Sequence, residues 1–135
     1  MNVDLFDLER FVTAQDSYDS YQTALQEVKD GWKQSHWMWY VFPQIQGLGH
    51  SSTSQKYSIK SLLEAKAFLL HNTLGERLRE IVNALPIHGD AEEIFGMIDA
   101  MNLRSCLTLF DLVSPNDIFS DFLEKSCLCQ HRSIF

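Results

Sequence analysis

The chain contains little cysteine, with Cys106, Cys127 and Cys129 the only three among 135 residues. Three cysteines provide neither an even disulfide framework nor the spaced pairs of a structural zinc site. The chain also lacks any apolar run near the roughly 20 residues that a membrane-spanning helix needs. Its first residues, MNVDLFDLER, carry acids where a signal peptide carries positive charge. We therefore expect a cytoplasmic protein without disulfides, metal, cofactor or membrane partner.

Positive charge is also scarce, because 11 Lys and Arg residues stand against 18 Asp and Glu residues and the formal net charge is −7. A general nucleic-acid binder needs clustered Lys and Arg to contact phosphates, so nucleic acid is not an expected partner. The charges are unevenly distributed, however. Residues 31–63 include no Asp or Glu, and this acid-free window holds Lys33, His36, His50, Lys56 and Lys60.

No segment alternates apolar and polar residues over a useful length, and no repeat or linker divides the chain. Apolar residues instead recur at three- and four-residue spacing, which is typical of helices. We expect helices near 4–15, 17–30, 62–70, 74–85, 91–95, 98–113 and 117–128, and favour a short helix over a strand at 36–42. Helix-capping pairs are expected at Ser61 with Glu64, Thr73 with Glu76, and Asp90 with Glu93. The prediction is one all-α domain over residues 1–135, a compact orthogonal arrangement of about six to eight helices with a long aromatic and glycine loop.

The segment SHWMWYVFPQIQGLGHSS, residues 35–52, concentrates residue types that bind ligands. Large aromatic side chains are most often core, but an aromatic wall also lines many pockets, so Trp37, Trp39 and Tyr40 are candidates to stack on a ligand. His36 is either a capping or core-edge residue or a general acid or base, and it is the candidate catalytic residue. Nothing in the sequence identifies its partner.

The loop after Pro43 combines Gly47 and Gly49 with several hydroxyl groups, including that of Ser51. Such a loop before a helix can direct backbone N–H groups at a phosphate, although an ordinary polar surface loop has the same composition. The chain lacks the Gly-Lys-Ser/Thr of a P-loop and the third glycine of a dinucleotide fingerprint. It also lacks the G-x-S-x-G and H-E-x-x-H motifs of serine hydrolases and zinc enzymes.

Arg104 lies within an apolar helical segment. It either extends its guanidinium to the helix edge or holds a carboxylate, a carbonyl or a ligand anion. Together with the polar residues of the acid-free window, it completes the set of candidates. The candidate ligand-binding residues are Lys33, Ser35, Trp37, Trp39, Tyr40, Gln44, Gly47, Gly49, Ser51, Lys56 and Arg104.

The segments LERFVTAQ, SHWMWYVFPQIQGLGHS, SLLEAKAFLLHNTLGERLRE, AEEIFG and NLRSCLTLF, in this order, carry a resemblance. Over about Leu8 to Phe110 the chain resembles the bacterial "domain of unknown function 1810" family, some of whose members are auto-labelled calpastatin. The resemblance implies a small, mainly helical cytoplasmic domain and no established activity. After Asp121 the chain departs from the family pattern, which leaves open an atypical, truncated or frameshifted tail after about residue 124. A fainter similarity to ADP-ribose-linked glycosidase-like families favours a nucleotide-like ligand.

These observations lead to a first hypothesis and two alternatives. The first is a pocket for a small anionic ligand, nucleotide or ADP-ribose-like, with hydrolysis as the expected reaction class if the protein is an enzyme. The second is a protein interaction module without catalysis, in which exposed aromatic residues bind a partner. The third is a buried polar network that only stabilises the fold. The oligomeric state does not follow from the sequence.

Overall fold

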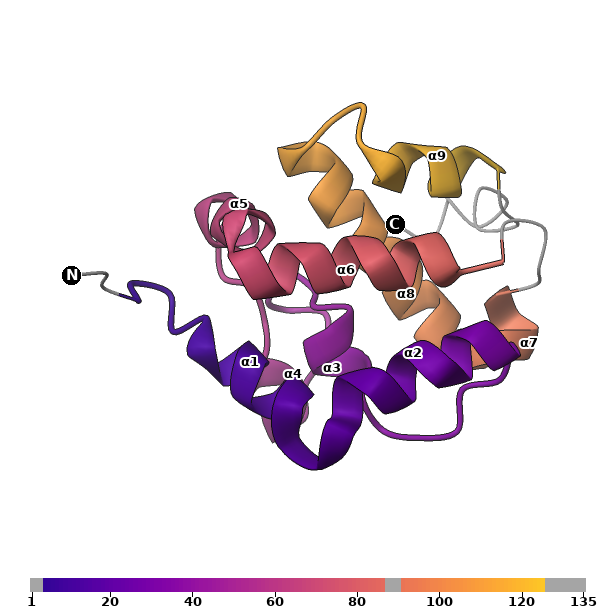
Figure 1. The fold of residues 1–135 in the computed structure, drawn as a ribbon. Coiled ribbons are helices and arrows are strands. Elements are labelled where there is room, and N and C mark those ends of the chain that lie inside the picture. Colours follow the sequence, from indigo (N-terminus) through magenta and orange to yellow (C-terminus); the bar gives the residue numbers. More distant parts are fainter. Residues whose placement is uncertain (1–3, 87–90, 126–135) are drawn as a thin grey trace.

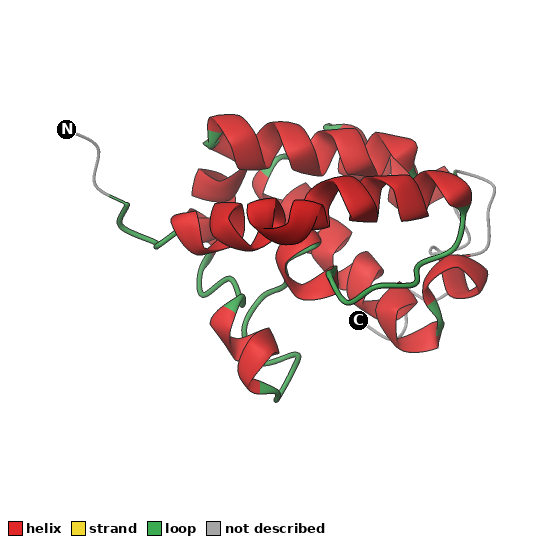
Figure 2. Ribbon diagram, turned by 60° about the horizontal axis from the view of Figure 1, so that its bottom comes forward, coloured by secondary structure: helices red, strands yellow, loops and turns green. Residues whose placement is uncertain are grey.

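A computed structural model of the chain describes residues 4–86 and 91–125, and its regular elements are helices (Figure 1). They are α1 (Glu9–Asp16), a 3-10 helix (Ser17–Asp19), α2 (Ser20–Asp30), α3 (Met38–Val41), α4 (Ser52–Lys56), α5 (Leu62–Leu70), α6 (Asn72–Ala84), α7 (Ala91–Phe95), α8 (Met97–Val113) and α9 (Ile118–Lys125). The expected all-α fold is thereby confirmed. Figure 2 shows the helices joined by loops, with no strand drawn in the described ranges.

Helix α8 forms the centre of the fold. It contacts α5, α7 and α9, while α6 contacts α2, α5 and α9 (Figure 1). Leu103, Leu107 and Phe110 of α8 are completely buried, as their helical spacing predicted. Burying one such side chain stabilises a fold by about 1.5–3 kcal/mol, so this stripe explains why α8 lies in the interior.

Aromatic residues link the segment after α2 to this core. Trp37 is 1% exposed and lies 6.0 Å from Phe42 and 6.2 Å from Phe95 between ring centroids. The edge-to-face arrangement of Trp37 and Phe95 is a favourable geometry for aromatic pairs. The prediction of a short helix at 36–42 is confirmed as α3, which begins directly after Trp37. Trp37 is therefore a core residue that anchors α3.

Several helix ends follow the sequence signals. Gly31 ends α2 with φ +77, a left-handed conformation that suits glycine. Ser61 Oγ accepts a hydrogen bond from Glu64 N and starts α5. The predicted cap at Thr73 is wrong, because α6 begins earlier and His71 Nδ1 accepts hydrogen bonds from Thr73 N and Leu74 N. The Nδ1 atom of His71 therefore caps α6 in place of the hydroxyl group expected from Thr73.

Some predictions lie outside the described residues. They are the cap at Asp90, the end of the last predicted helix beyond Lys125, and the tail that includes Cys127 and Cys129. Within 4–86 and 91–125, no helix is long and apolar enough to cross a membrane. Cys106 is buried in α8, and burial raises the pKa of its thiol well above the ordinary value.

Candidate functional site

Two segments on either side of α4 lie next to each other. Ile45 and Ile59 form an isolated parallel bridge, in which Ile59 N donates to Gln44 O at 2.7 Å and Gln46 N donates to Ile59 O at 2.8 Å. Residues fourteen positions apart in the sequence are thus paired. The pairing brings the chain around Gln44 alongside the chain around Ser58 and Lys60.

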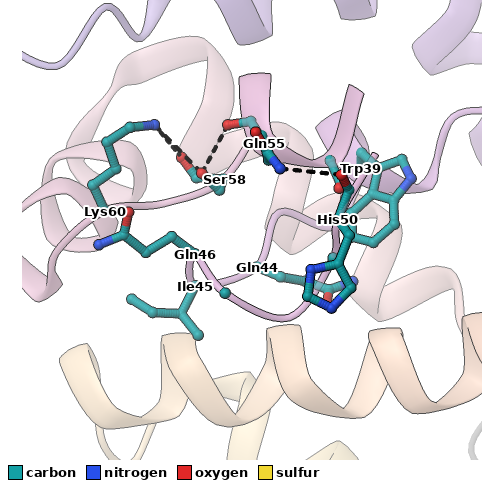
Figure 3. A pocket seen from close by; sticks show the side chains of 11 residues that line it. Trp39, Gln44, Ile45, Gln46, His50, Gln55, Ser58 and Lys60 are labelled. Carbon is teal, nitrogen blue, oxygen red and sulfur yellow. Dashed lines mark hydrogen bonds between the residues drawn. The ribbon is translucent and has the colours of Figure 1, made fainter. Parts of the chain in front are cut away.

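A pocket of about 460 Å³ lies between these two segments, α4 and the glycine-containing loop of residues 47–51 (Figure 3). We call it the loop pocket. Its lining consists of Trp39, Gln44, Ile45, Gln46, Gly47, Gly49, His50, Ser54, Gln55, Ser58 and Lys60. The volume lies in the range of small-molecule sites. Most of these residues are polar, and among the described residues the lining includes one lysine, one histidine and no carboxylate.

The two glycines of the loop are required for different reasons. Gly47 has φ +97, a conformation that residues with a side chain rarely adopt. At Gly49 a Cβ atom would lie 2.6 Å from Ser54 Oγ and 2.9 Å from Trp39 Cη2. Gly49 therefore allows the loop to pass closely over α4 and the Trp39 ring. Both residues belong to the predicted set.

Ser51 has a structural role at the start of α4. Its Oγ accepts a hydrogen bond from Ser54 N at 3.1 Å and lies 3.0 Å from Ser54 Oγ. Because Ser51 already caps this five-residue helix, its N–H groups are not an obvious phosphate site. The expectation of a phosphate at the start of a helix gains no support from α4.

Gln44 is the most unusual residue of the lining. Its side chain is 2% exposed, and neither Oε1 nor Nε2 has a hydrogen-bond partner among the described residues. Gln15 is equally buried, but its Nε2 donates to Tyr40 O and its Oε1 accepts from Arg77 Nη1. Burying an amide without a partner costs about 1–3 kcal/mol. The hydrogen bonds of Gln15 offset this cost, whereas the amide of Gln44 has no such bond among the described residues.

The formally charged side chain among the described lining residues is the ammonium group of Lys60. Lys60 Nζ donates to Ser58 Oγ at 3.3 Å, and no carboxylate whose side chain the structure describes forms an ion pair with it. Glu64 lies nearby, but its Oε1 accepts from Lys60 N and its Oε2 pairs with Arg10. The acid-free window of the sequence thus supplies a pocket wall whose ammonium group has no carboxylate partner among the described side chains.

Other predicted residues are brought together at a different place. Glu27 accepts hydrogen bonds from Ser35 N, Ser35 Oγ and Trp37 Nε1 at 3.0, 2.6 and 2.9 Å. Lys33 Nζ donates to Ser35 O at 2.6 Å and pairs with Asp99 at 3.0 Å. Two carboxylates from outside the acid-free window therefore bind the polar groups of this segment. Glu27 accepts hydrogen bonds from Ser35 and Trp37, and Asp99 pairs with Lys33. These contacts agree with the third hypothesis, a polar network that stabilises the fold.

The remaining predicted residues also lie outside the lining. His36 is exposed. The hydroxyl of Tyr40 is hydrogen-bonded to Ser20 Oγ at 2.6 Å, and Lys56 Nζ lies 5.3 Å from the centroid of the Tyr57 ring. Arg104 is 4% exposed within α8. Of the predicted set, the loop pocket gathers only Trp39, Gln44, Gly47 and Gly49.

Sequence reasoning omitted several lining residues. These are Ile45, Gln46, Ser58 and Lys60, whereas His50, Ser54 and Gln55 belong to the glycine and hydroxyl loop, or directly follow it, which the sequence had indicated. A signal was present, because all of them lie within the acid-free window. What the pattern did not reveal is the pairing of Ile45 with Ile59, since an isolated bridge leaves no alternation in the sequence.

Comparisons with known proteins identify a matching family and a similar solved structure. The family model described as "Protein of unknown function (DUF1810)" matches residues 5–133. The solved structure of the conserved hypothetical protein Rv1873 from Mycobacterium tuberculosis is similar, with 43% sequence identity and a TM-score of 0.85. The likeness covers 91% of this chain and 89% of that chain. No curated protein matches the sequence.

Proposed function

This chain belongs to the DUF1810 family of proteins of unknown function, and we propose that its loop pocket binds a small anionic ligand, such as a nucleotide or an ADP-ribose-like molecule. The observation that carries the proposal is the charge of the lining. In a chain of net charge −7, the pocket contains Lys60 and His50, and no carboxylate of the described residues lines it. A cationic pocket within an acidic protein concentrates anions and repels cations.

The position of Lys60 supports the proposal. Its side chain is exposed, and Figure 3 shows it on the opposite side of the pocket from Trp39 and His50. A ligand anion at Lys60 forms a charge-assisted hydrogen bond without displacing a carboxylate, and such bonds contribute about 1.5–3 kcal/mol. The ammonium group of Lys33 is already paired with Asp99, so a ligand anion there would have to displace a carboxylate. The anion is therefore assigned to Lys60 rather than to Lys33.

The proposal is one of binding. Hydrolysis needs a positioned base or an activated water, and the lining contains no carboxylate. His36 is exposed outside the pocket, whereas His50 lies within it. A hydrolytic activity, and a catalytic role for His36, stay predictions. The protein interaction module also stays a prediction, but it loses part of its basis because Trp37 is buried and the Tyr40 hydroxyl is already hydrogen-bonded.

Thermal unfolding of the full chain with phosphate-bearing probes tests the proposal. Inorganic phosphate, ribose 5-phosphate, AMP and ADP-ribose are added separately at millimolar concentrations. A ligand that binds only the folded state raises the melting temperature in proportion to ln(1 + [L]/Kd). We expect at least one organic phosphate to raise it, and we expect the rise to shrink with added salt because charge–charge attraction is screened.

Two lysine variants locate the site. Lys60→Gln removes the ammonium group of the pocket, whereas Lys66→Gln removes one from an exposed position of α5 outside the lining. Lys60→Gln should weaken binding about tenfold or more, and Lys66→Gln should leave the affinity unchanged. The proposal is overturned if no phosphate-bearing probe stabilises the chain, or if both variants bind as the unmodified chain does.

A further inference from the structure

We infer that Gln44 is a specificity-determining residue that reads the edge of a planar heterocyclic base, so that the ligand class of the loop pocket is a base-bearing phosphate rather than a sugar phosphate. This inference rests on the proposed function, because it concerns the same pocket. It depends, however, on a different observation. The proposed function is carried by charge at Lys60, and the inference is carried by the unpartnered amide of Gln44.

The amide of Gln44 is built as a recognition group. Its backbone is held in place by the hydrogen bond from Ile59 N to Gln44 O at 2.7 Å, next to the bridge of Ile45 and Ile59. The side chain is buried, yet Oε1 and Nε2 have no partner among the described residues. A methionine would occupy a similar volume without an unsatisfied polar group. A polar end that costs stability in the unliganded protein is explained if a ligand supplies the missing bonds.

The surroundings of Gln44 suit a flat, partly apolar group. Trp39 lines the same pocket, and the side chains of Trp39, Gln44 and His50 lie together on one side of it in Figure 3. Stacking of a base on an aromatic side chain contributes about 1–3 kcal/mol. Gln44 lines the pocket and is 2% exposed, which places it at the buried end.

The pocket therefore has two ends of different chemistry. The buried end offers an aromatic ring and an amide, and the exposed Lys60 offers a cation that pairs with no carboxylate in the part of the chain that the structure describes. A nucleotide matches this arrangement, because a sugar joins its planar base to its phosphate group. A sugar phosphate alone would satisfy Lys60 but would leave the amide of Gln44 without a planar partner.

A glutamine amide presents one donor and one acceptor side by side. The matching edge of a ligand presents an adjacent acceptor and donor, as adenine does with its amino group and neighbouring ring nitrogen. The uracil, cytosine and guanine edges also carry a donor next to an acceptor. The inference therefore names the class of base-bearing phosphates and leaves the choice among bases to measurement.

Isothermal titration of the full chain with AMP, GMP, CMP, UMP, adenosine and ribose 5-phosphate tests the inference. We expect at least one nucleoside monophosphate to bind about tenfold or more tightly than ribose 5-phosphate. Gln44→Met should reduce that difference about tenfold, leaving only what stacking on Trp39 contributes, and it should leave the affinity for ribose 5-phosphate unchanged. Gln22→Met is the matched control, because Gln22 lies at an exposed position of α2 outside the lining, and it should preserve the difference.

The outcomes separate the two proposals. If ribose 5-phosphate and the nucleotides bind equally, or if the preference is undiminished in Gln44→Met, base recognition by Gln44 is overturned while anion binding stands. If adenosine binds as tightly as AMP and ribose 5-phosphate does not bind, the anion proposal fails and the role of Gln44 stands. If nothing binds, both are overturned.

A measurement on the unmodified chain tests the inference without requiring that the Gln44→Met variant folds. The side-chain NH₂ signals of glutamine are resolved in ¹H–¹⁵N spectra, and those of Gln44 should shift when the preferred nucleotide is added. Ribose 5-phosphate should not move them. A shift of the Lys60 region alone would contradict a direct contact between the base and Gln44.

Discussion

Arg10 and Glu64 are 54 positions apart in the sequence and form an ion pair of 2.7 Å beside the loop pocket. Arg10 Nη2 also donates to Ser58 O at 2.9 Å, and Glu64 Oε1 accepts from Lys60 N at 2.9 Å. Ser58 and Lys60 both line the pocket. The pair therefore connects α1 and α5 and holds one wall of the pocket through its backbone.

Removing one partner of this pair should destabilise the protein strongly. The side chains are only 10% and 3% exposed, and a buried charge that loses its partner costs about 3–5 kcal/mol. We expect Glu64→Gln to lower the free energy of unfolding in urea by an amount of this order. Asp16→Asn breaks the more exposed pair with Arg77 and should cost at most about 1 kcal/mol. Similar effects of the two substitutions would contradict the assigned role.

Two buried glutamines provide a matched test of the unpartnered amide. Gln15→Met leaves Tyr40 O and Arg77 without the bonds that Gln15 makes, and it should cost about 1–3 kcal/mol. Gln44→Met removes an amide that has no partner, so it should be neutral or stabilising in the absence of ligand. Chemical denaturation of both variants measures the difference. Equal destabilisation would mean that Gln44 is already satisfied in the unliganded protein.

Most of the fold could be predicted because its signals are local. Apolar spacing, Ser61 and Gly31 mark helices and their ends within a few residues of where they act. The start of α6 escaped prediction because histidine is an uncommon cap, and only its three-dimensional position shows that His71 Nδ1 faces two backbone N–H groups. Local chemistry predicts a helix better than it predicts an unusual cap.

The candidate site was predictable only where it is continuous in sequence. Trp39, Gln44, Gly47 and Gly49 lie in one segment, and they lie together in the pocket. The charges around them depend on distant residues. Asp99 neutralises Lys33, whereas no described carboxylate pairs with Lys60, although both lysines belong to the same acid-free window. Sequence composition could identify the window but not which lysine keeps its charge available.

Glu27 should make the stability of the protein depend on pH in the acidic range. Burial alone would raise the pKa of Glu27, but hydrogen bonds from Ser35, Gln34 N and the Trp37 indole outweigh it and hold the pKa below its ordinary value. A lowered folded-state pKa stabilises the protein above the unfolded-state pKa, about 4.3. This stabilisation is lost as the pH falls through the lowered pKa.

Glu27→Gln isolates that contribution. At pH 7 it should destabilise the chain by about 1–2 kcal/mol, because a charged acceptor is replaced by a neutral one. The difference from the unmodified chain should shrink as the pH falls through the lowered pKa of Glu27, where the carboxylate of the unmodified chain also gains a proton. Urea unfolding at several pH values measures it. Glu76→Gln, at an exposed position of α6, should give little difference at any pH, and a constant effect of Glu27→Gln would contradict the hydrogen-bonded carboxylate.

Gly49→Ala should destabilise the chain by overpacking, at a cost of about 1–3 kcal/mol, because the added Cβ meets Ser54 and Trp39. Gly47→Ala should also cost about 1–2 kcal/mol, but through its positive φ, since nothing lies within 4 Å of the added atom. A double-mutant cycle with Ser54→Gly distinguishes the two causes. Ser54→Gly removes the two nearest atoms, so its coupling with Gly49→Ala should exceed about 0.5 kcal/mol, while its coupling with Gly47→Ala should be near zero. Equal couplings would mean that the loop does not pass over α4 as closely as described, and the buried end of the pocket would then be wider than the site of a single stacked base.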